Sequence, residues 1–239
     1  MAKEKVLLTV AARGGSKGVK NKNIRELCGF PLIAHSILQA KRWGRADKIV
    51  CSTDSPAIAE VARRYGAEVP FLRPAELAGD TAGKIDVLRH CLQTIEVGSG
   101  AKYDVIVDLD ATAPIREVAD INGAFELFLA RRPKSVFSVT PARKNPYFNM
   151  VELGPDGYAG LAKRPGDSVK RRQDAPRVYD MNASIYVYDR EFLLDRSAVT
   201  AVTDRSLIWE MSELSAFDID HESDFQFIEF LVAKGLVRL

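Results

Sequence analysis

Residues 6–23 read VLLTVAARGGSKGVKNKN, an apolar run that gives way to a loop rich in glycine, lysine and asparagine. The run Val6–Ala12 is short and almost continuously apolar, which is typical of a strand buried on both faces of a parallel sheet. Pro31–Trp43 then shows helical periodicity, with a proline near its start, where its missing N–H is tolerated. A buried strand, a glycine loop and a helix in this order predict the first unit of an α/β sheet.

The rest of the chain alternates between short apolar runs and amphipathic segments, as expected when helices cover a mostly parallel sheet. Further strands are predicted at Lys48–Ser52, Val69–Leu72, Val105–Leu109, Ser135–Val139 and Asn182–Tyr188. Further helices are predicted at Pro56–Tyr65, Lys84–Ile95, Val118–Ala130 and Asp224–Ala233. Because no internal repeat is visible in the 239 residues, we expect one α/β domain over residues 1–239, with a mixed, mostly parallel sheet.

One stretch, from Pro141 to Tyr179, has a different character. It is rich in proline, glycine and charged residues and contains short alternating pieces such as Phe148–Leu153. The turn residues of 154–157 (GPDG) follow that piece directly, as in a β-hairpin. The sequence therefore predicts that residues 141–180 form a hairpin excursion from the main sheet.

The overall composition limits the class of protein. The chain has 34 basic and 32 acidic residues, and this near balance argues against a general nucleic-acid binder. Its N-terminal apolar run is too short to cross a membrane. The cysteines Cys28, Cys51 and Cys91 have no C-x-x-C spacing and are interpreted as reduced thiols, with Cys51 buried. We therefore expect a cytoplasmic protein that contacts neither nucleic acid nor a membrane.

The loop after the first strand carries the chemistry of an anion site. Its glycines allow several backbone N–H groups to point inward together and form a nest for an anion. Arg13, Lys17, Lys20 and Lys22 surround this nest with positive charge, which suits a triphosphate. The letters match neither the P-loop nor the G-x-G-x-x-G dinucleotide fingerprint. An exposed lysine-rich turn is the plain structural alternative.

Several motifs together resemble one enzyme family. Ala12–Gly18 fits the pattern A-R-x-x-S-K-G, and Lys22-Asn23 follows shortly after. The similarity continues through Ile49–Asp54, Leu72–Ala82 and Phe217–Asp224, so it covers nearly the whole chain. The pattern resembles the CMP-sialic acid synthetases (acylneuraminate cytidylyltransferases), and most of all their CMP-legionaminic acid synthetase branch. The resemblance implies a three-layer Rossmann-like nucleotide-diphosphosugar transferase fold, a homodimer that exchanges hairpin contacts, CTP as donor, and Mg²⁺ (or Mn²⁺) as cofactor.

The same resemblance implies roles for individual residues. Arg13, Lys22 and Asn23 would contact the CTP phosphates, Arg73 would lie near the nucleotide, and Arg13, Lys22 and Asp220 would act in catalysis. The full set of predicted substrate-binding residues is Arg13, Gly15, Ser16, Lys17, Lys22, Asn23, Arg73, Thr81, Asp110, Arg172, Gln173 and Asn182.

An acidic motif near the C-terminus predicts a metal-binding site. In the sequence Phe217-Asp218-Ile219-Asp220, apolar and acidic residues alternate, so a strand would turn both aspartates to one side. Two carboxylates on one side suit Mg²⁺, whose coordination shell is completed by phosphates and water. The alternative is that Asp220 or Ser223 merely caps the next helix. The family resemblance favours Asp218 and Asp220 as the metal ligands.

A second acidic motif departs from the family. The sequence DLDATAP at 108–114 ends the central strand, where open α/β sheets bind ligands. Asp110 stands where sialic-acid-activating members have a glutamine that contacts the sugar. Asp110 is therefore a candidate metal ligand or sugar contact, with a strand-end cap as the structural alternative. The general base stays open between Asp218, Asp110 and a metal-bound hydroxide.

The region beyond residue 140 bears on the choice of sugar. Arg172-Gln173 lies in the basic run Lys163–Arg177 and resembles the R-Q pair of the family, whose arginine suits a carboxylate. Thr140–Met150 and Tyr179–Tyr188 are predicted to wall the sugar pocket, with Ser184 where neuraminate-specific members carry glycine or alanine. Near Phe148 the family often has a lysine, so the wall of the pocket is more apolar in this sequence. An apolar wall favours a sugar that ends in a methyl group over one that ends in a hydroxylated glycerol.

These features predict a cytidylyltransferase in which the C2 hydroxyl of a nine-carbon acidic sugar attacks the α-phosphorus of CTP and pyrophosphate leaves. Legionaminic acid ranks first as the sugar, ahead of N-acetylneuraminate. Three alternatives stay open: a CMP-Kdo-type synthetase for an eight-carbon acidic sugar, a nicotinamide oxidoreductase, and a non-catalytic CTP-binding regulator.

Overall fold

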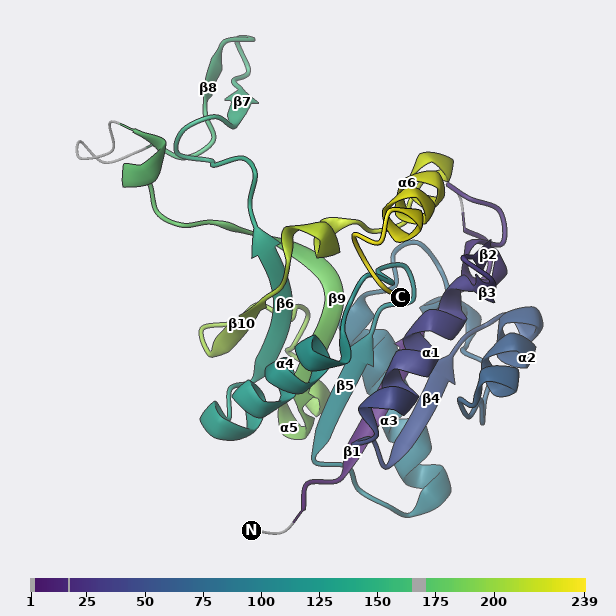
Figure 1. The fold of residues 1–239 in the computed structure, drawn as a ribbon. Helices are drawn as coiled ribbons and strands as arrows, with labels where there is room; N and C mark the ends of the chain where they lie inside the picture. The colour runs from purple at the N-terminus through teal and green to yellow at the C-terminus, as the bar shows by residue number, and fades with distance from the viewer. Residues whose placement is uncertain (1–2, 17, 165–170) are drawn as a thin grey trace.

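The computed structural model describes residues 3–16, 18–164 and 171–239. Its main sheet has six strands in the order β10-β6-β9-β5-β1-β4 (Figure 1). The bounds of these strands are β1 Val6–Ala11, β4 Lys48–Ser52, β5 Val105–Leu109, β6 Ser135–Pro141, β9 Tyr179–Asp189 and β10 Ser206–Glu210.

The sheet is mixed but mostly parallel, as predicted. Strand β1 pairs in parallel with both β4 and β5, and β6 pairs in parallel with β10. Only β9 runs the other way, between β5 and β6. Because the parallel strands end at the same edge, the segments that follow β1, β4 and β5 lie together at that edge. The strand β10 was not predicted from the sequence.

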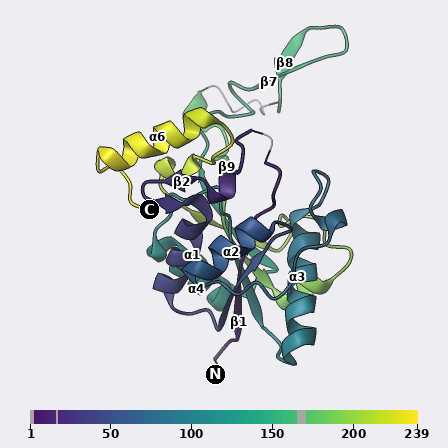
Figure 2. The same ribbon diagram turned by 90° about the vertical axis from the view of Figure 1, so that its right-hand side faces the viewer.

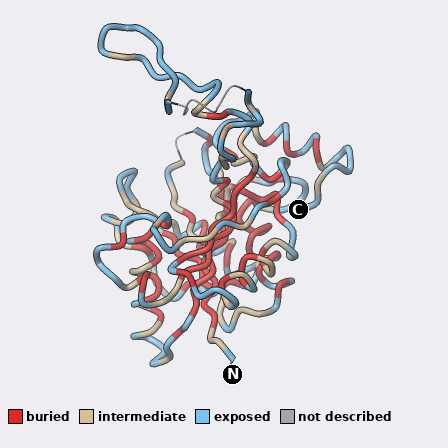
Figure 3. Tube along the Cα trace, turned by 90° about the vertical axis from the view of Figure 1, so that its left-hand side faces the viewer, coloured by how far each residue is buried: buried red, intermediate tan, exposed pale blue. Residues whose placement is uncertain are grey.

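Helices cover both faces of the sheet and complete three layers (Figure 1). One face packs against α1, α2 and α4, whose apolar residues join those of β1, β5 and β9 in one buried cluster. The other face packs against α3 and α5 in a second cluster. Figure 3 shows the buried residues concentrated in this central body. The predicted three-layer α/β fold is confirmed, with helices α1 Leu32–Trp43, α2 Pro56–Tyr65, α3 Lys84–Ser99, α4 Val118–Arg131, α5 Arg190–Leu194 and α6 Glu222–Ala233.

In a third apolar cluster, the C-terminal helix packs against the loop after β1. Phe225 and Ile228 of α6 are buried with Val19 from that loop and with Ile219 from the segment before the helix. The same cluster includes Leu27 of the small antiparallel pair β2 Glu26–Leu27 and β3 Phe30–Pro31. Residues near both ends of the chain are thereby brought side by side at the edge where β1 ends.

The region 141–180 contains a hairpin that projects from the body (Figure 2). Strands β7 Val151–Leu153 and β8 Ala159–Leu161 pair antiparallel around the predicted turn at 154–157. Their side chains are exposed, including Val151 (65%), Leu153 (76%) and Tyr158 (78%). This apolar surface is not covered by any other part of the chain that the structure describes.

Two local predictions are wrong. Residues 69–72 form no strand: only Glu68 makes a bridge to β4, and the next backbone hydrogen bond that this part of the chain makes with other described residues is from the Arg73 N–H to the carbonyl of Thr53 (2.7 Å). Residues 217–220 are irregular and follow the short 3₁₀ helix Glu213–Ala216. The other 3₁₀ helices span Lys22–Ile24, Ala75–Leu77 and Arg172–Asp174. No helix in the described part of the chain is both long and apolar enough to span a bilayer.

The contact between α4 and β10 predicts a stability effect. A Cβ on Gly123 would lie 2.1 Å from the Trp209 ring, whose indole N–H is anchored to Asp120 Oδ1 (3.2 Å). We expect Gly123→Ala to lower the free energy of unfolding by about 1–3 kcal/mol through overpacking. Gly98→Ala, in α3 with open space around it, is the matched control and should be neutral or stabilising. Urea unfolding measures both, and equal stability of the two variants would contradict the packing.

Candidate active site

The loop that follows β1 is held in one shape by its neighbours. The Gly14 N–H donates to Oδ1 of Asp54 (2.8 Å), beyond the end of β4. The Asn23 side-chain amide donates to the carbonyl of Arg13 (3.0 Å), which closes the loop across its base. Gly15 has a φ of +67°, a conformation that glycine adopts without strain. The described residues of the loop, on either side of Lys17, are therefore anchored at the carboxyl end of β1.

A cavity of about 280 Å³ lies against this loop. Its lining combines the loop with residues from the end of β5 and from the C-terminal acidic motif, and consists of Ala11, Ala12, Arg13, Ser16, Gly18, Lys22, Asn23, Thr112 and Asp220. The structure thus brings together five of the predicted site residues: Arg13, Ser16, Lys22, Asn23 and Asp220. A smaller recess of about 40 Å³ on the other side of the loop includes Gly15.

Direct contacts join the loop to the acidic motif. The Lys22 ammonium lies 3.1 Å from Oδ1 of Asp220 and also donates to the carbonyl of Ile219. On the loop, Arg13 forms an ion pair with Asp80 (2.6 Å), which holds its guanidinium beside the cavity. Cations and a carboxylate therefore face one small cavity, an arrangement suited to a phosphate chain together with a divalent cation.

Gly18 is required for this close approach. A Cβ at Gly18 would lie 2.1 Å from the backbone oxygen of Asp220, so alanine must push the loop and the acidic motif apart. We expect Gly18→Ala to weaken binding of CTP by about ten-fold or more, because a shift of about 1 Å at a positioned site has large effects. Calorimetric titration with CTP checks this, with Gly98→Ala as the control. Wild-type affinity in Gly18→Ala would contradict the contact.

The aspartate pair lies on either side of a buried residue. Ile219 is fully buried and its N–H donates to the carbonyl of Thr112 (2.9 Å), which fixes the segment without a strand. Asp220 is exposed in the cavity, whereas Oδ1 of Asp218 is buried and has no hydrogen-bond partner. Burial raises the pKa of the Asp218 carboxyl against the opposing effect of a hydrogen bond with the Thr112 side chain, and the charges of Asp110 and Asp220 act in the same direction as burial.

These residues fit a magnesium ion that is shared with a substrate. Within residues 3–16, 18–164 and 171–239, no group of three or more histidine, cysteine or carboxylate side chains is arranged to hold a metal ion. Mg²⁺ usually needs only one or two carboxylates, because phosphates and water supply the other ligands. The unpartnered oxygen of Asp218 and the carboxylate of Asp220 supply that number.

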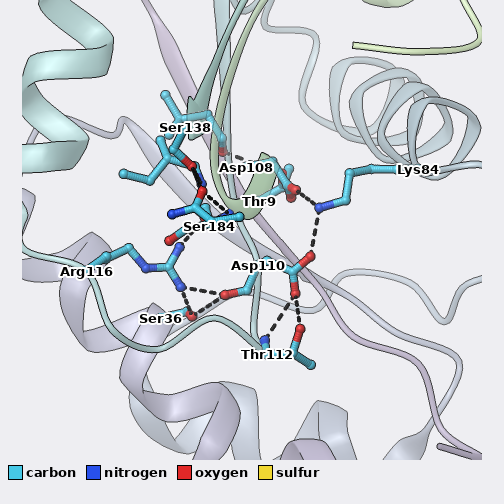
Figure 4. A network of polar contacts seen from close by, with 12 residues as sticks. Thr9, Ser36, Lys84, Asp108, Asp110, Thr112, Arg116, Ser138 and Ser184 are labelled. Atoms are coloured by element: carbon cyan, nitrogen blue, oxygen red, sulfur yellow. Dashed lines mark hydrogen bonds and ion pairs between the residues drawn. The ribbon is translucent and has the colours of Figure 1, made fainter. Parts of the chain in front are cut away.

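Asp110 has a different environment from the open position expected for a sugar or metal contact (Figure 4). Its Oδ2 pairs with the Lys84 ammonium (2.8 Å), and its Oδ1 accepts from the N–H (3.1 Å) and hydroxyl (2.8 Å) of Thr112. Burial opposes ionisation, but Lys84 and Thr112 outweigh it and lower the pKa of Asp110 to about 2. Both carboxylate oxygens thus already accept hydrogen bonds from the protein, and the role of Asp110 as a metal ligand or sugar contact stays a prediction.

Arg116 was missed from the sequence and organises the same edge (Figure 4). It is 2% exposed and donates to the carbonyls of Asp110 and Ser184 and to the hydroxyl of Ser36 (2.7 Å). Burial lowers the pKa of Arg116 to about 10. Nothing in the local sequence distinguishes this arginine from a surface one, because its burial depends on α1, β5 and β9 together.

Two residues that were predicted as ligand contacts, Arg73 and Asn182, make hydrogen bonds within the scaffold, and their ligand contacts stay predictions. Arg73 is buried and its guanidinium donates to the hydroxyl (3.1 Å) and carbonyl of Ser52. The Asn182 amide accepts from the hydroxyl of Ser138 (2.6 Å) and donates to the carbonyl of Ser215 (3.0 Å). Neither residue lines the cavity beside the loop.

The remaining predicted residues lie elsewhere or are not described. Thr81 is exposed and lies outside the lining of that cavity. Gln173 lines a separate cavity of about 570 Å³ at the base of the excursion, with Arg177, Tyr179 and Glu210. Lys17 and the side chain of Arg172 fall outside the described part of the structure, so their predicted contacts stay predictions.

The fold and the cavity are those of an α/β enzyme in which a loop with cationic side chains faces a carboxylate at the edge of a mostly parallel sheet. The chain belongs to the cytidylyltransferase family, whose model matches residues 7–231. Members transfer nucleotidyl groups, so the chain is a nucleotidyltransferase. The resemblance found in the sequence motifs is thereby confirmed.

Individual relatives agree with this family. The chain is 46% identical to the post-translational flagellin modification protein B of Campylobacter coli, over 96% of this chain and 95% of the relative. It is 44% identical to the CMP-N,N'-diacetyllegionaminic acid synthase of Campylobacter jejuni, over 95% of each. A CMP:2-keto-3-deoxy-manno-octonic acid synthetase, solved with CTP, has the same fold, with a TM-score of 0.71, 15% identity and coverage of 97% and 99%.

Proposed function

We propose that this enzyme joins CTP to a nine-carbon acidic sugar and releases pyrophosphate. The observation that carries the proposal is the cavity where Arg13 and Lys22 from the phosphate loop face Asp220 from the other end of the chain. Phosphoryl transfer depends mainly on positioning and charge neutralisation, and this cavity supplies both. The similarity to a relative named for CMP-N,N'-diacetyllegionaminic acid synthesis supports the choice of a nine-carbon acid.

In the proposed reaction, the C2 hydroxyl oxygen of the sugar forms a bond to the α-phosphorus of CTP and loses its proton to a general base, for which Asp218 and Asp110 are the candidate side chains. The bond from that phosphorus to the bridging oxygen breaks, and the pyrophosphate carries away the electron pair. Arg13 and Lys22 stabilise the charge that accumulates on the leaving group. Asp218 and Asp220 would hold Mg²⁺, or Mn²⁺ in its place, which when bound polarises phosphate oxygens as a Lewis acid.

Legionaminic acid is the proposed sugar, ahead of N-acetylneuraminic acid. Ser184 lies on β9 next to Ala183, whose φ of +54° marks a position that favours glycine, as in the N-G-A-I-Y of neuraminate-specific members. Phe148 is 45% exposed at the foot of the hairpin and gives this region an apolar surface. An apolar wall favours a terminal methyl group over a hydroxylated chain by about ten-fold or more.

A pyrophosphate-release assay tests the proposal. The assay combines CTP and Mg²⁺ with legionaminic acid, N-acetylneuraminic acid and an eight-carbon acid of the Kdo type, and substitutes UTP or ATP as nucleotide controls. We expect release with CTP and a nine-carbon acid, fastest with legionaminic acid. Release only with the eight-carbon acid would favour the Kdo-type alternative. Binding of CTP without release from any sugar would favour a non-catalytic regulator.

We also propose that the enzyme works as a homodimer in the cytoplasm. The exposed apolar side chains of Val151, Leu153 and Tyr158 on the projecting hairpin suit burial against a second copy. The cysteines are unpaired, with Cys51 and Cys91 buried, as a reducing compartment favours. Equilibrium sedimentation should give twice the chain mass of 26.4 kDa, and a monomer mass at assay concentration would contradict the dimer.

A further inference from the structure

Lys84, the first residue of α3, lies between two carboxylates at the end of β5 (Figure 4). Its ammonium nitrogen is 2.8 Å from Oδ2 of Asp110 and 3.2 Å from Oδ2 of Asp108. The other oxygen of Asp108 accepts from the hydroxyl of Thr9 on β1 (2.7 Å). The ammonium also lies 4.4 Å from the centroid of the Tyr186 ring on β9. Side chains from three neighbouring strands therefore fix the position of Lys84.

The cluster is held by charge as well as by geometry. Burial works against the charge on Lys84, but Asp110 and Asp108 outweigh it and raise its pKa well above the usual value. One cation and two carboxylates carry a formal charge of −1. The Asp108 side chain is 1% exposed, so solvent screens its interactions little. Loss of Lys84 would leave two neighbouring carboxylates in mutual repulsion.

A chain of contacts leads from this cluster to Asp218 and Asp220, the candidate metal ligands. Asp110 holds Thr112 by two hydrogen bonds through its second oxygen. Thr112 lines the cavity of about 280 Å³ beside the loop after β1. Its carbonyl accepts a hydrogen bond from the N–H of Ile219, which lies between the two aspartates. The position of Lys84 is thus coupled to that of Asp218 and Asp220 through three intervening residues, Asp110, Thr112 and Ile219.

We propose that Lys84 is a positioning residue for the reaction. Lys84 neutralises Asp110 and fixes the orientation of its carboxylate. It thereby holds Thr112 and residues 218–220 in place opposite the loop after β1. This role deepens the proposed function and rests on it. Lys84 itself contacts neither Arg13 nor Lys22 in the described structure, so its effect should fall on the chemical step rather than on the capture of CTP.

The test is a double-variant cycle on Lys84→Met and Asp110→Asn. Lys84→Met should lower kcat by about 10²-fold through misplacement of the aspartate pair, while KM for CTP changes by less than about three-fold. Asp110→Asn alone should also lose activity, because an amide cannot accept both from Lys84 and from Thr112 through one oxygen. The double variant removes the repulsion and keeps an oxygen for Thr112, so it should be more active than either single variant.

Lys48→Met is the matched control, because Lys48 forms a comparable pair with Glu68 (2.7 Å) far from the cavity, at the start of β4. It should leave kcat unchanged. Thermal melting establishes that each variant is folded. If Lys84→Met does not fold, the comparison of Asp110→Asn with the double variant carries the test, and a double variant no better than Asp110→Asn would overturn the proposal.

A second readout separates this inference from the proposed function. The affinity for Mg²⁺ alone, measured by calorimetry without nucleotide, should fall in Lys84→Met and stay intact in Lys48→Met. If the wild type releases no pyrophosphate with any sugar, the proposed function fails, and the calorimetric comparison still tests Lys84. A folded Lys84→Met variant with kcat within about three-fold of wild type, or with an unchanged affinity for Mg²⁺, would overturn the positioning role.

Discussion

Asp220→Ala should abolish Mg²⁺-dependent turnover, with kcat lower by about 10³-fold, the size of effect seen when a group that stabilises transition-state charge is removed. The Asp220 side chain is 67% exposed, so the substitution removes little packing and the protein should stay folded. The loss arises because Asp220 is the carboxylate that lines the cavity, and Asp218 alone then remains of the proposed metal ligands. Steady-state kinetics at several Mg²⁺ concentrations measures the effect.

The matched control for this variant is Glu222→Ala. Glu222 lies two residues further along the chain, is 57% exposed and also pairs with a cation, Arg25, but it does not line the cavity. Its removal should leave turnover unchanged. If Asp220→Ala kept near-normal rates, or if Glu222→Ala lost as much activity, the metal assignment to the aspartate pair would be wrong.

Lys22→Met should lower kcat/KM for CTP by about 10²-fold, because a hydrogen bond to a charged group contributes about 1.5–3 kcal/mol and Lys22 can make more than one. The Lys22 side chain is 14% exposed and lies in the cavity wall, where its charge is only partly screened. Initial rates over a range of CTP concentrations give the parameter. Methionine keeps the length of the aliphatic stem, so the variant tests charge rather than packing.

Lys20 provides the comparison within the same loop. The sequence places it among the cations around the nest, whereas the structure leaves it exposed and outside the cavity lining. Lys20→Met should therefore change kcat/KM by less than about three-fold. Equal losses in Lys20→Met and Lys22→Met would indicate a diffuse field of positive charge and would contradict a specific role for Lys22.

Much of the fold could be predicted because its strongest signals are local. Val6–Ala11 and Val105–Leu109 are short apolar runs, and they form the buried central strands. The edge strand Ser206–Glu210 gave no such signal, because edge strands are only half covered and its residues are largely exposed or intermediate. The run 69–72 failed for the opposite reason: Val69 is buried but Leu72 is 51% exposed, and hydrogen bonding to β4 ends at Glu68.

The candidate site was predicted where residue types alone indicate chemistry. The glycine and lysine loop and Asp220 of the aspartate pair line one cavity, although residues 217–220 form no strand. Their alternation survives because Ile219 is buried and bonded to Thr112. Lys84 and Arg116 were missed because the contacts of a buried charged side chain come from other elements and cannot be predicted from the local sequence. For the same reason, the sequence did not show that the carboxylate of Asp110 accepts hydrogen bonds from Lys84 and Thr112.

The central claim is that the loop after β1 binds the phosphates of a cytidine nucleotide opposite Asp218 and Asp220. A crystal structure of the enzyme with CTP and Mg²⁺ tests it most directly. We expect the triphosphate in the cavity of about 280 Å³, in hydrogen-bond contact with Arg13 and Lys22, and the metal on the aspartate pair. Phosphates bound at any other place on the molecule, with this cavity empty, would contradict the account.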